Sequence, residues 1–167
     1  AEPALYLYRL KMGDHIQTGV AGTWSVEEYE KDLIKKHEKT RRDKEDDRTH
    51  HMCALRAQTG KVFLTYKASV KVDAIVARVA EGVPLFDFAA DDGVAHTVWR
   101  ASNSDRDALV EAFARLPELY IADGHHRSAA AARVYQSRSG AGHSGSFLAV
   151  IFPHNQMQIL PYNRVLE

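Results

Sequence analysis

Short runs of apolar residues separated by turn residues predict most of the strands in this chain. Such runs, rich in β-branched and aromatic side chains, are typical of strands. They cover residues 5–10, 16–23, 62–66, 85–89, 94–100, 119–122, 147–152 and 157–160. Gly13-Asp14 and Asp91-Asp92-Gly93 fall between consecutive runs, and turns of this composition predict two β-hairpins.

A second pattern, polar capping residues followed by helix formers, predicts the helices between these strands. Ser25 and Glu28 match a capping box, which predicts a helix over residues 26–37. Further helices are predicted at residues 46–58, ended by Gly60, at 72–80, at 104–116, capped by Ser104, and in the alanine-rich segment 128–135. The mixture of elements predicts an α+β fold, or α/β, with a small mixed sheet and packed helices.

Composition and charge narrow the class of protein. Hydrophobic residues make up 45% of the 167 positions and the formal net charge is zero, so no global positive field favours nucleic-acid binding. Cys53 is the only cysteine, which excludes an internal disulfide, and its apolar neighbours predict a buried structural role. No apolar run is long enough to cross a bilayer, and there is no signal-peptide pattern. We therefore expect a cytoplasmic protein, with residues 1–167 forming a single domain excised from a longer chain.

An unusually polar stretch occupies residues 35–51, which include no aliphatic residue and no phenylalanine, tyrosine or tryptophan. A surface helix normally keeps an apolar stripe that holds it on the core, so packing alone does not order this segment. Three interpretations remain open: a solvated connection with pairs such as Glu38 and Arg42, a lid that orders over an anionic ligand, and a nucleic-acid contact. The third is the least favoured, because five acidic residues interrupt the basic ones.

The clearest chemical signal is the turn Asp-Gly-His-His-Arg at residues 123–127, between the predicted strand 119–122 and the alanine-rich helix. The N-terminus of a helix offers unpaired N–H groups and a partial positive charge, so it binds anions. An arginine fork and imidazole donors at the same place suit a phosphate group. The alternative is structural: Gly124 adopts a positive φ, Asp123 caps the helix, and the two histidines lie on the surface.

Other kinds of site find less support. Asp123, the histidines of the turn and His37, His50 or His51 are possible metal ligands, but adjacent histidines at a helix start diverge by about 100°. The chain has no His-Glu-x-x-His motif, no Walker phosphate loop and no Rossmann glycine signature. The glycine- and serine-rich residues 137–146 lack the lysine of a phosphate loop and predict a flexible connection.

Several motifs give the chain a family resemblance. Residues 120–127 (Tyr-Ile-Ala-Asp-Gly-His-His-Arg), with His-Glu-Lys-Thr at 37–40 and Asp-Lys-Glu-Asp-Asp-Arg at 43–48, resemble the bacterial family called domain of unknown function 1015. Asp-Gly-Val-Ala-His at 92–96, ahead of Trp99, is also similar to that family. The resemblance covers essentially the whole chain, while family members run longer at both ends.

The glycine turn is in addition similar to the signature of the ParB and sulfiredoxin superfamily, which includes the free-serine kinases. In those proteins a Gly-x-His-Arg or Gly-Glu-Arg-Arg turn at a helix start holds nucleotide phosphates. The resemblance implies that phosphate is contacted directly by Gly124, His126 and Arg127. It implies that His125 and Asp123 orient those residues or bind metal.

These observations lead to the hypothesis of a nucleotide- or phosphate-binding domain that transfers phosphate from ATP or ADP, with Mg²⁺, to a small hydroxyl substrate such as free serine. Glu38 or Asp123 is expected to accept the proton of the attacking hydroxyl, and Mg²⁺ is expected near the same carboxylates. The expected phosphate ligands are Gly124, His125, His126, Arg127, Arg41 and Arg48. The expected substrate or lid residues are His37, Thr40, Lys44 and Asp47. The alternatives are a non-catalytic nucleotide-sensing module of ParB type and a metal-dependent hydrolase; neither a membrane nor a nucleic acid is an expected partner.

Overall fold

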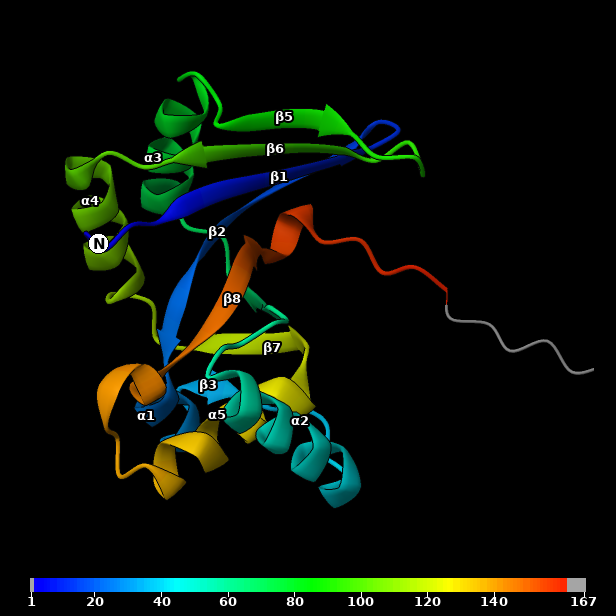
Figure 1. Ribbon diagram of the computed structural model, residues 1–167. Coiled ribbons are helices and arrows are strands. Elements are labelled where there is room, and N and C mark those ends of the chain that lie inside the picture. Colours follow the sequence, from blue (N-terminus) through cyan, green and yellow to red (C-terminus); the bar gives the residue numbers. More distant parts are fainter. Residues whose placement is uncertain (1, 162–167) are drawn as a thin grey trace, which may run out of the picture.

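The computed structural model describes residues 2–161 and confirms an α+β fold (Figure 1). Within those residues one mixed sheet has eight strands in the order β3-β7-β4-β8-β2-β1-β6-β5. The strands are β1 (Tyr6–Met12), β2 (His15–Ser25), β3 (Ile34–Lys35), β4 (Val62–Tyr66), β5 (Phe86–Ala89), β6 (Ala95–Arg100), β7 (Leu119–Asp123) and β8 (Ser146–Pro153). The helices are α1 (Val26–Glu30), α2 (Arg42–Leu55), α3 (Val70–Ala80), α4 (Asn103–Phe113) and α5 (His125–Ser137).

Both predicted hairpins form. The turn between β1 and β2 contains Gly13 (φ 58°), and the turn between β5 and β6 contains Gly93 (φ 81°). These left-handed values favour glycine, which has no Cβ to clash with the backbone. The predicted strand at residues 157–160 does not form: β8 leads into a short 3₁₀ helix, His154–Gln156, and residues 157–160 pair with no strand of the described chain.

The sheet is strongly twisted, and its two ends carry different helices (Figure 1). α3 and α4 pack at the end that contains β1, β5 and β6, whereas α1, α2 and α5 lie at the end that contains β3, β4 and β7. β2 and β8 join the two ends through the centre of the sheet. The two parallel pairs, β3 with β7 and β4 with β8, belong to the second end, which also carries the glycine turn.

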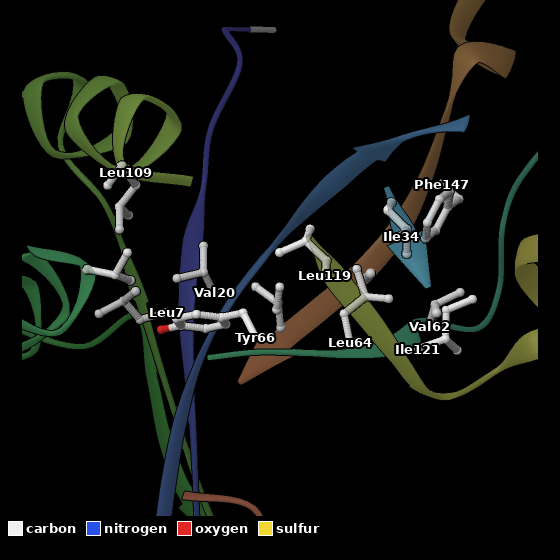
Figure 2. Packing of buried hydrophobic residues seen from close by; sticks show 14 of the residues in the cluster. Leu7, Val20, Ile34, Val62, Leu64, Tyr66, Leu109, Leu119, Ile121 and Phe147 are labelled. Atoms are coloured by element: carbon white, nitrogen blue, oxygen red, sulfur yellow. The ribbon is translucent and has the colours of Figure 1, made fainter. Parts of the chain in front are cut away.

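One hydrophobic core extends through both ends of the sheet (Figure 2). Leu7 and Leu109 lie at one end of this cluster, Tyr66 lies between, and Ile121 and Phe147 lie at the other. All five side chains are almost completely buried. Because buried apolar surface is the main source of folding stability, β7, which leads into the glycine turn, is anchored in the core.

The first helix is much shorter than the capping box predicted. Ser25 caps α1 as expected, its hydroxyl accepting a hydrogen bond from the Glu28 N–H at 3.2 Å. α1 nevertheless ends at Glu30 rather than at residue 37, and Asp32 then takes a left-handed conformation (φ 58°). The chain turns there so that the buried side chain of Ile34 joins the sheet beside β7. Burial of this isoleucine overrides the local helical pattern.

Other boundaries differ by a few residues. α2 begins at Arg42 and ends at Leu55, with the left-handed Arg56 (φ 51°) as its C-cap, so Gly60 is not its stop. The capping residue of α4 is Ser102 rather than Ser104, because the Ser102 hydroxyl accepts the hydrogen bond at the helix start. α5 begins at His125 instead of residue 128. The two histidines of the turn therefore belong to the first turn of the helix itself.

Two findings concern the surface of the described residues. None of their helices combines the length and the apolar character needed to cross a membrane. Cys53, for which the sequence predicted burial, is exposed. It is exposed because α2 is covered only along the face that carries Glu45, Thr49 and Met52, the least exposed residues of that helix.

The two-residue strand β3 offers a matched test of this arrangement, because Ile34 is fully buried while the adjacent Leu33 is 46% exposed. We expect Ile34→Ala to lower the free energy of unfolding by ~2–5 kcal/mol through lost packing and a residual cavity. Leu33→Ala should change it by only ~0.5 kcal/mol. Urea unfolding measures both, and equal losses would contradict the burial of Ile34.

Candidate functional site

The turn between β7 and α5 is built around Gly124. Its φ of 98° lies in the left-handed region, and a Cβ there would lie 3.2 Å from the Cα of Val62 and 3.0 Å from the Nε of Arg127. Glycine is therefore the residue that fits this close approach. Gly124 is also the N-cap of α5, and no side chain of residues 2–161, Asp123 included, makes a capping hydrogen bond there. The first N–H groups of α5 thus lack a side-chain acceptor.

His125, the first residue of α5, is buried. Its Nε2 accepts a hydrogen bond from the backbone N–H of His37 at 3.5 Å, and the two rings pack edge to face with centroids 4.4 Å apart. Its Nδ1 lies 3.6 Å from Oε2 of Glu38. Burial lowers the pKa of His125 and nearby His37 lowers it further, while the carboxylates of Glu38 and Asp123 oppose the shift. The protein therefore favours the neutral imidazole.

His126 makes a related contact one residue later. Its Nε2 accepts a hydrogen bond from the backbone N–H of Arg41 at 3.1 Å. A ring nitrogen that accepts a hydrogen bond carries no proton, so the proton of this ring lies on Nδ1. The two adjacent imidazoles together hold residues 37–41, which we call the strap, across the start of α5. Backbone N–H groups of the strap donate these two hydrogen bonds, and the side chains of His37 and Glu38 also lie against His125.

Arg127 is fixed by its surroundings. Its guanidinium Nη2 donates to Oδ2 of Asp123 at 2.5 Å. A Cβ built on Gly60 would lie 3.1 Å from the Arg127 Cδ. The absence of a side chain at both Gly60 and Gly124 therefore leaves room for the Arg127 side chain. Its Nε is buried without a hydrogen-bond partner among residues 2–161, and the side chain is 33% exposed. Arg127 is thus held in place with part of its donor capacity unused.

The polar segment after the strap is helical and docks on α5 through charged groups. Arg133 of α5 donates to Oδ1 of Asp46 at 2.6 Å and lies 3.5 Å from Oε2 of Glu45. Glu45 also accepts a hydrogen bond from the Thr40 hydroxyl. Met52 is the residue of α2 that packs against the hydrophobic core. Ion pairs and one methionine therefore replace the missing apolar stripe.

The structure brings some of the predicted site residues together and leaves others apart. His37, Glu38 and the backbone of Arg41 contact the histidines of the turn. The Arg41 guanidinium instead pairs with Asp43 at 2.8 Å. The Thr40 hydroxyl donates a hydrogen bond to Glu45 near the start of α2. Lys44, Asp47 and Arg48 are exposed on α2, and no contact joins their side chains to the turn within residues 2–161. The functional roles of all these residues stay predictions.

Sequence reasoning missed two residues that shape the site. Gly60 was interpreted as a helix stop, and nothing local indicates that it makes room for Arg127. Arg133 follows four alanines in α5. Its only signal is complementarity of charge with the acidic run of the polar stretch, and that signal does not specify which acidic residues it contacts.

A metal site of protein ligands finds no support in the described chain. Among residues 2–161 no group of three or more histidine, cysteine, aspartate or glutamate side chains is placed to hold an ion. Mg²⁺ has a different requirement, because it takes one or two carboxylates together with substrate phosphates and water. Glu38 is 58% exposed, and Asp123, which pairs with Arg127, is 72% exposed; Mg²⁺ binding near these carboxylates stays a prediction.

Comparison with known proteins places the chain in a family. The family described as "Protein of unknown function (DUF1015)" matches residues 1–167. The chain belongs to the DUF1015 family. A search of curated proteins and a search of solved structures each gave no match. The family match confirms the resemblance inferred from the motifs, while the similarity of the DUF1015 turn to the ParB and sulfiredoxin signature stays a prediction.

Gly124 and Gly93 form a matched pair, because both have a positive φ but a Cβ at Gly93 would meet nothing within 4 Å. We expect Gly93→Ala to cost ~1–2 kcal/mol for the left-handed conformation alone. Gly124→Ala should cost a further ~1–3 kcal/mol, because the methyl group presses on Val62 and Arg127. Urea unfolding measures both, and equal costs would contradict the close packing at the turn.

The lowered pKa of His125 predicts a pH dependence of stability. Because the folded protein favours the neutral ring, protonation favours the unfolded chain, where the pKa is about 6.5. The free energy of unfolding should therefore fall as the pH drops below about 6.5. His125→Gln keeps an acceptor for the His37 N–H and should reduce this slope, whereas His50→Gln, an exposed residue of α2, should not. Urea midpoints between pH 5 and 8 test this, and an unchanged slope in His125→Gln would refute it.

Proposed function

We propose that this DUF1015 domain binds the phosphate groups of a nucleotide at the start of α5. The observation that carries the proposal is the placement of Arg127. Its guanidinium is held against Gly60 and Gly124, beside a helix N-terminus that no side chain of residues 2–161 caps. Unpaired N–H groups and an arginine fork are the donors that phosphate oxygens accept from.

The neighbours of Arg127 take distinct roles in this proposal. Asp123 holds the guanidinium when no ligand is present, and its exposed carboxylate is free to move away when a phosphate competes for Arg127. His126 carries its proton on Nδ1, which is a further donor to a phosphate oxygen. His125 is buried and bonded to the strap, so it positions the strap rather than contacting the ligand.

Phosphate transfer is the second part of the proposal. Glu38 lies beside His125, at the edge of the same helix start, with an exposed carboxylate. It would accept the proton of a substrate hydroxyl, with free serine as the substrate to test first. The hydroxyl oxygen would form a bond to the terminal phosphorus of ATP or ADP as the bond to the bridging oxygen breaks, leaving the shortened nucleotide. Mg²⁺, when bound with the nucleotide, would neutralise charge on its phosphate oxygens.

A second candidate, a nucleotide sensor without turnover, is favoured by one specific observation. The strap is held by the imidazoles of the same turn that would bind phosphate, and it continues into α2. A ligand that changes the positions of His125 or His126 would change what holds the strap. Occupancy of the turn would then alter the docking of α2 on α5, with no chemical step required.

Calorimetric titration with ATP, ADP and pyrophosphate tests the binding part. We expect Arg127→Ala and Arg127→Lys to weaken binding by about 10- to 100-fold, because a charge-assisted bidentate contact contributes roughly 1.5–3 kcal/mol. Arg127→Lys keeps the positive charge and loses only the two-pronged guanidinium. Comparing it with Arg127→Ala distinguishes a lost phosphate contact from a loss of stability. Arg115→Ala, which removes an exposed arginine paired with Glu111, is the control and should bind normally. Binding that ignores Arg127 would rule the site out.

A phosphate-transfer assay on the same protein distinguishes the kinase from the nucleotide sensor. Labelled ATP and free serine are incubated with the protein and with Glu38→Gln, and phosphoserine is measured. Transfer that Glu38→Gln abolishes, with nucleotide binding intact, supports the kinase. Binding without product supports the sensor and discards phosphate transfer to serine.

A further inference from the structure

A cavity of about 530 Å³ lies between the C-terminal ends of α2 and α5 and the loop that follows α5. This volume is in the usual range for small-molecule sites. The cavity touches α5 at Ala131 and Val134 and its C-cap at Arg138, which follow Arg127 by four, seven and eleven residues. At 1.5 Å per helical residue the separation from Arg127 is roughly 6–17 Å along the helix. The cavity and the glycine turn are therefore distinct places on the same helix.

The lining of the cavity combines an apolar wall with a basic rim. Met52, Ala131, Val134 and Leu148 supply apolar surface. Two arginines and a histidine also line it, and no aspartate or glutamate does. The basic residues are Arg56, Arg138 and His143.

The two arginines are not neutralised by the described part of the protein. The ion pairs formed within residues 2–161 include neither Arg56 nor Arg138. Arg56 is the C-cap of α2 and Arg138 the C-cap of α5. A cation at a helix C-terminus complements the helix dipole, which accounts for one charge at each helix end. The dipole does not explain why both helices end at the same cavity. Nor does it explain why the lining of that cavity adds a histidine and contains no aspartate or glutamate.

Hydrogen bonds between one side chain and the backbone of β8 fix one wall of the cavity. Gln58 donates from Nε2 to the carbonyl of Ser146 at 2.9 Å and accepts at Oε1 from the Leu148 N–H at 2.7 Å. Arg56 (φ 51°) and Ser139 (φ 50°) have left-handed backbones. Such conformations are uncommon for residues other than glycine, and at Arg56 the left-handed conformation terminates α2. The residues 137–146, predicted from sequence as a flexible connection, therefore form one wall of a shaped cavity.

We propose that this cavity binds a small organic anion that has an apolar body. Arg56 and Arg138 would hold its carboxylate, sulfate or phosphate group, since the guanidinium fork matches these groups. The body of the ligand would pack on Met52, Val134 and Leu148. This site does not depend on the nucleotide site proposed above.

Cys53 provides a reporter for this site. It lines the cavity, is exposed, and is the only cysteine of the chain, so alkylation by iodoacetamide reports on one thiol. Octanoate is the probe, and octanol is the matched uncharged molecule. We expect octanoate to slow the alkylation of Cys53 at concentrations where octanol does not. In the double variant Arg56→Gln/Arg138→Gln the protecting concentration should rise by about tenfold or more, because charge-assisted hydrogen bonds are lost.

A second measurement needs no ligand and uses the unaltered protein. Iodoacetate and iodoacetamide have the same leaving group and differ in charge, so their rate ratio at Cys53 reports the local potential. We expect the ratio of the iodoacetate rate to the iodoacetamide rate to be higher at Cys53 than for N-acetylcysteine amide, because the arginines attract the anionic reagent. The ratio should decrease at high salt, which screens that attraction. Arg115→Gln, which removes an arginine outside this cavity, should leave both measurements unchanged. Equal protection by octanol, no protection by octanoate, or a ratio no higher than that of the free thiol would overturn the proposal.

Discussion

The absence of a side chain at residue 124 is the constraint on which the rest of the candidate site depends. It lets the backbone turn with a positive φ from β7 into α5, close to the backbone of β4. Small residues continue this close packing along α5, since Ser128 and the alanines 130–132 are all buried. The Ser128 hydroxyl donates to the carbonyl of His125 at 3.0 Å, so a serine fits the buried position after Arg127. A helix seated this closely directs its first residues at the strap.

Charge replaces apolar surface as the means of attaching the second helix. α2 carries no apolar stripe, yet Arg133 joins it to α5 through Asp46 and Glu45. Exposed ion pairs are individually weak and are screened by salt, so this attachment is less firm than packing in the core. The strap is held through two hydrogen bonds that its backbone donates to imidazole nitrogens. The site thus combines a rigid floor, formed by β7 and α5, with a cover whose attachment responds to ionic strength and pH.

Local signals in the sequence predicted the features that local physics decides. Hydrophobic runs and glycine turns predicted seven of the eight strands among residues 2–161, all but β3, and both hairpins, and the glycine–histidine turn was found from its position between a strand and a helix. Features decided by distant residues escaped prediction. The shortening of α1 reflects burial of Ile34 beside β7, the ordering of α2 requires Arg133, and the position of Arg127 requires Gly60. In each case the deciding partner lies far along the chain, and no short motif encodes it.

The order of strands has a consequence for the way this chain is made. β8, which contains residues 146–153, lies in the middle of the sheet between β4 and β2. A ribosome releases the chain from its N-terminus, so β1, β2 and β4 emerge long before the strand that joins them. Contacts between such distant segments slow folding, and unpaired strand edges are templates for aggregation. Until residues 146–153 have emerged, the edges of β4 and β2 that β8 covers in the folded protein stay unpaired.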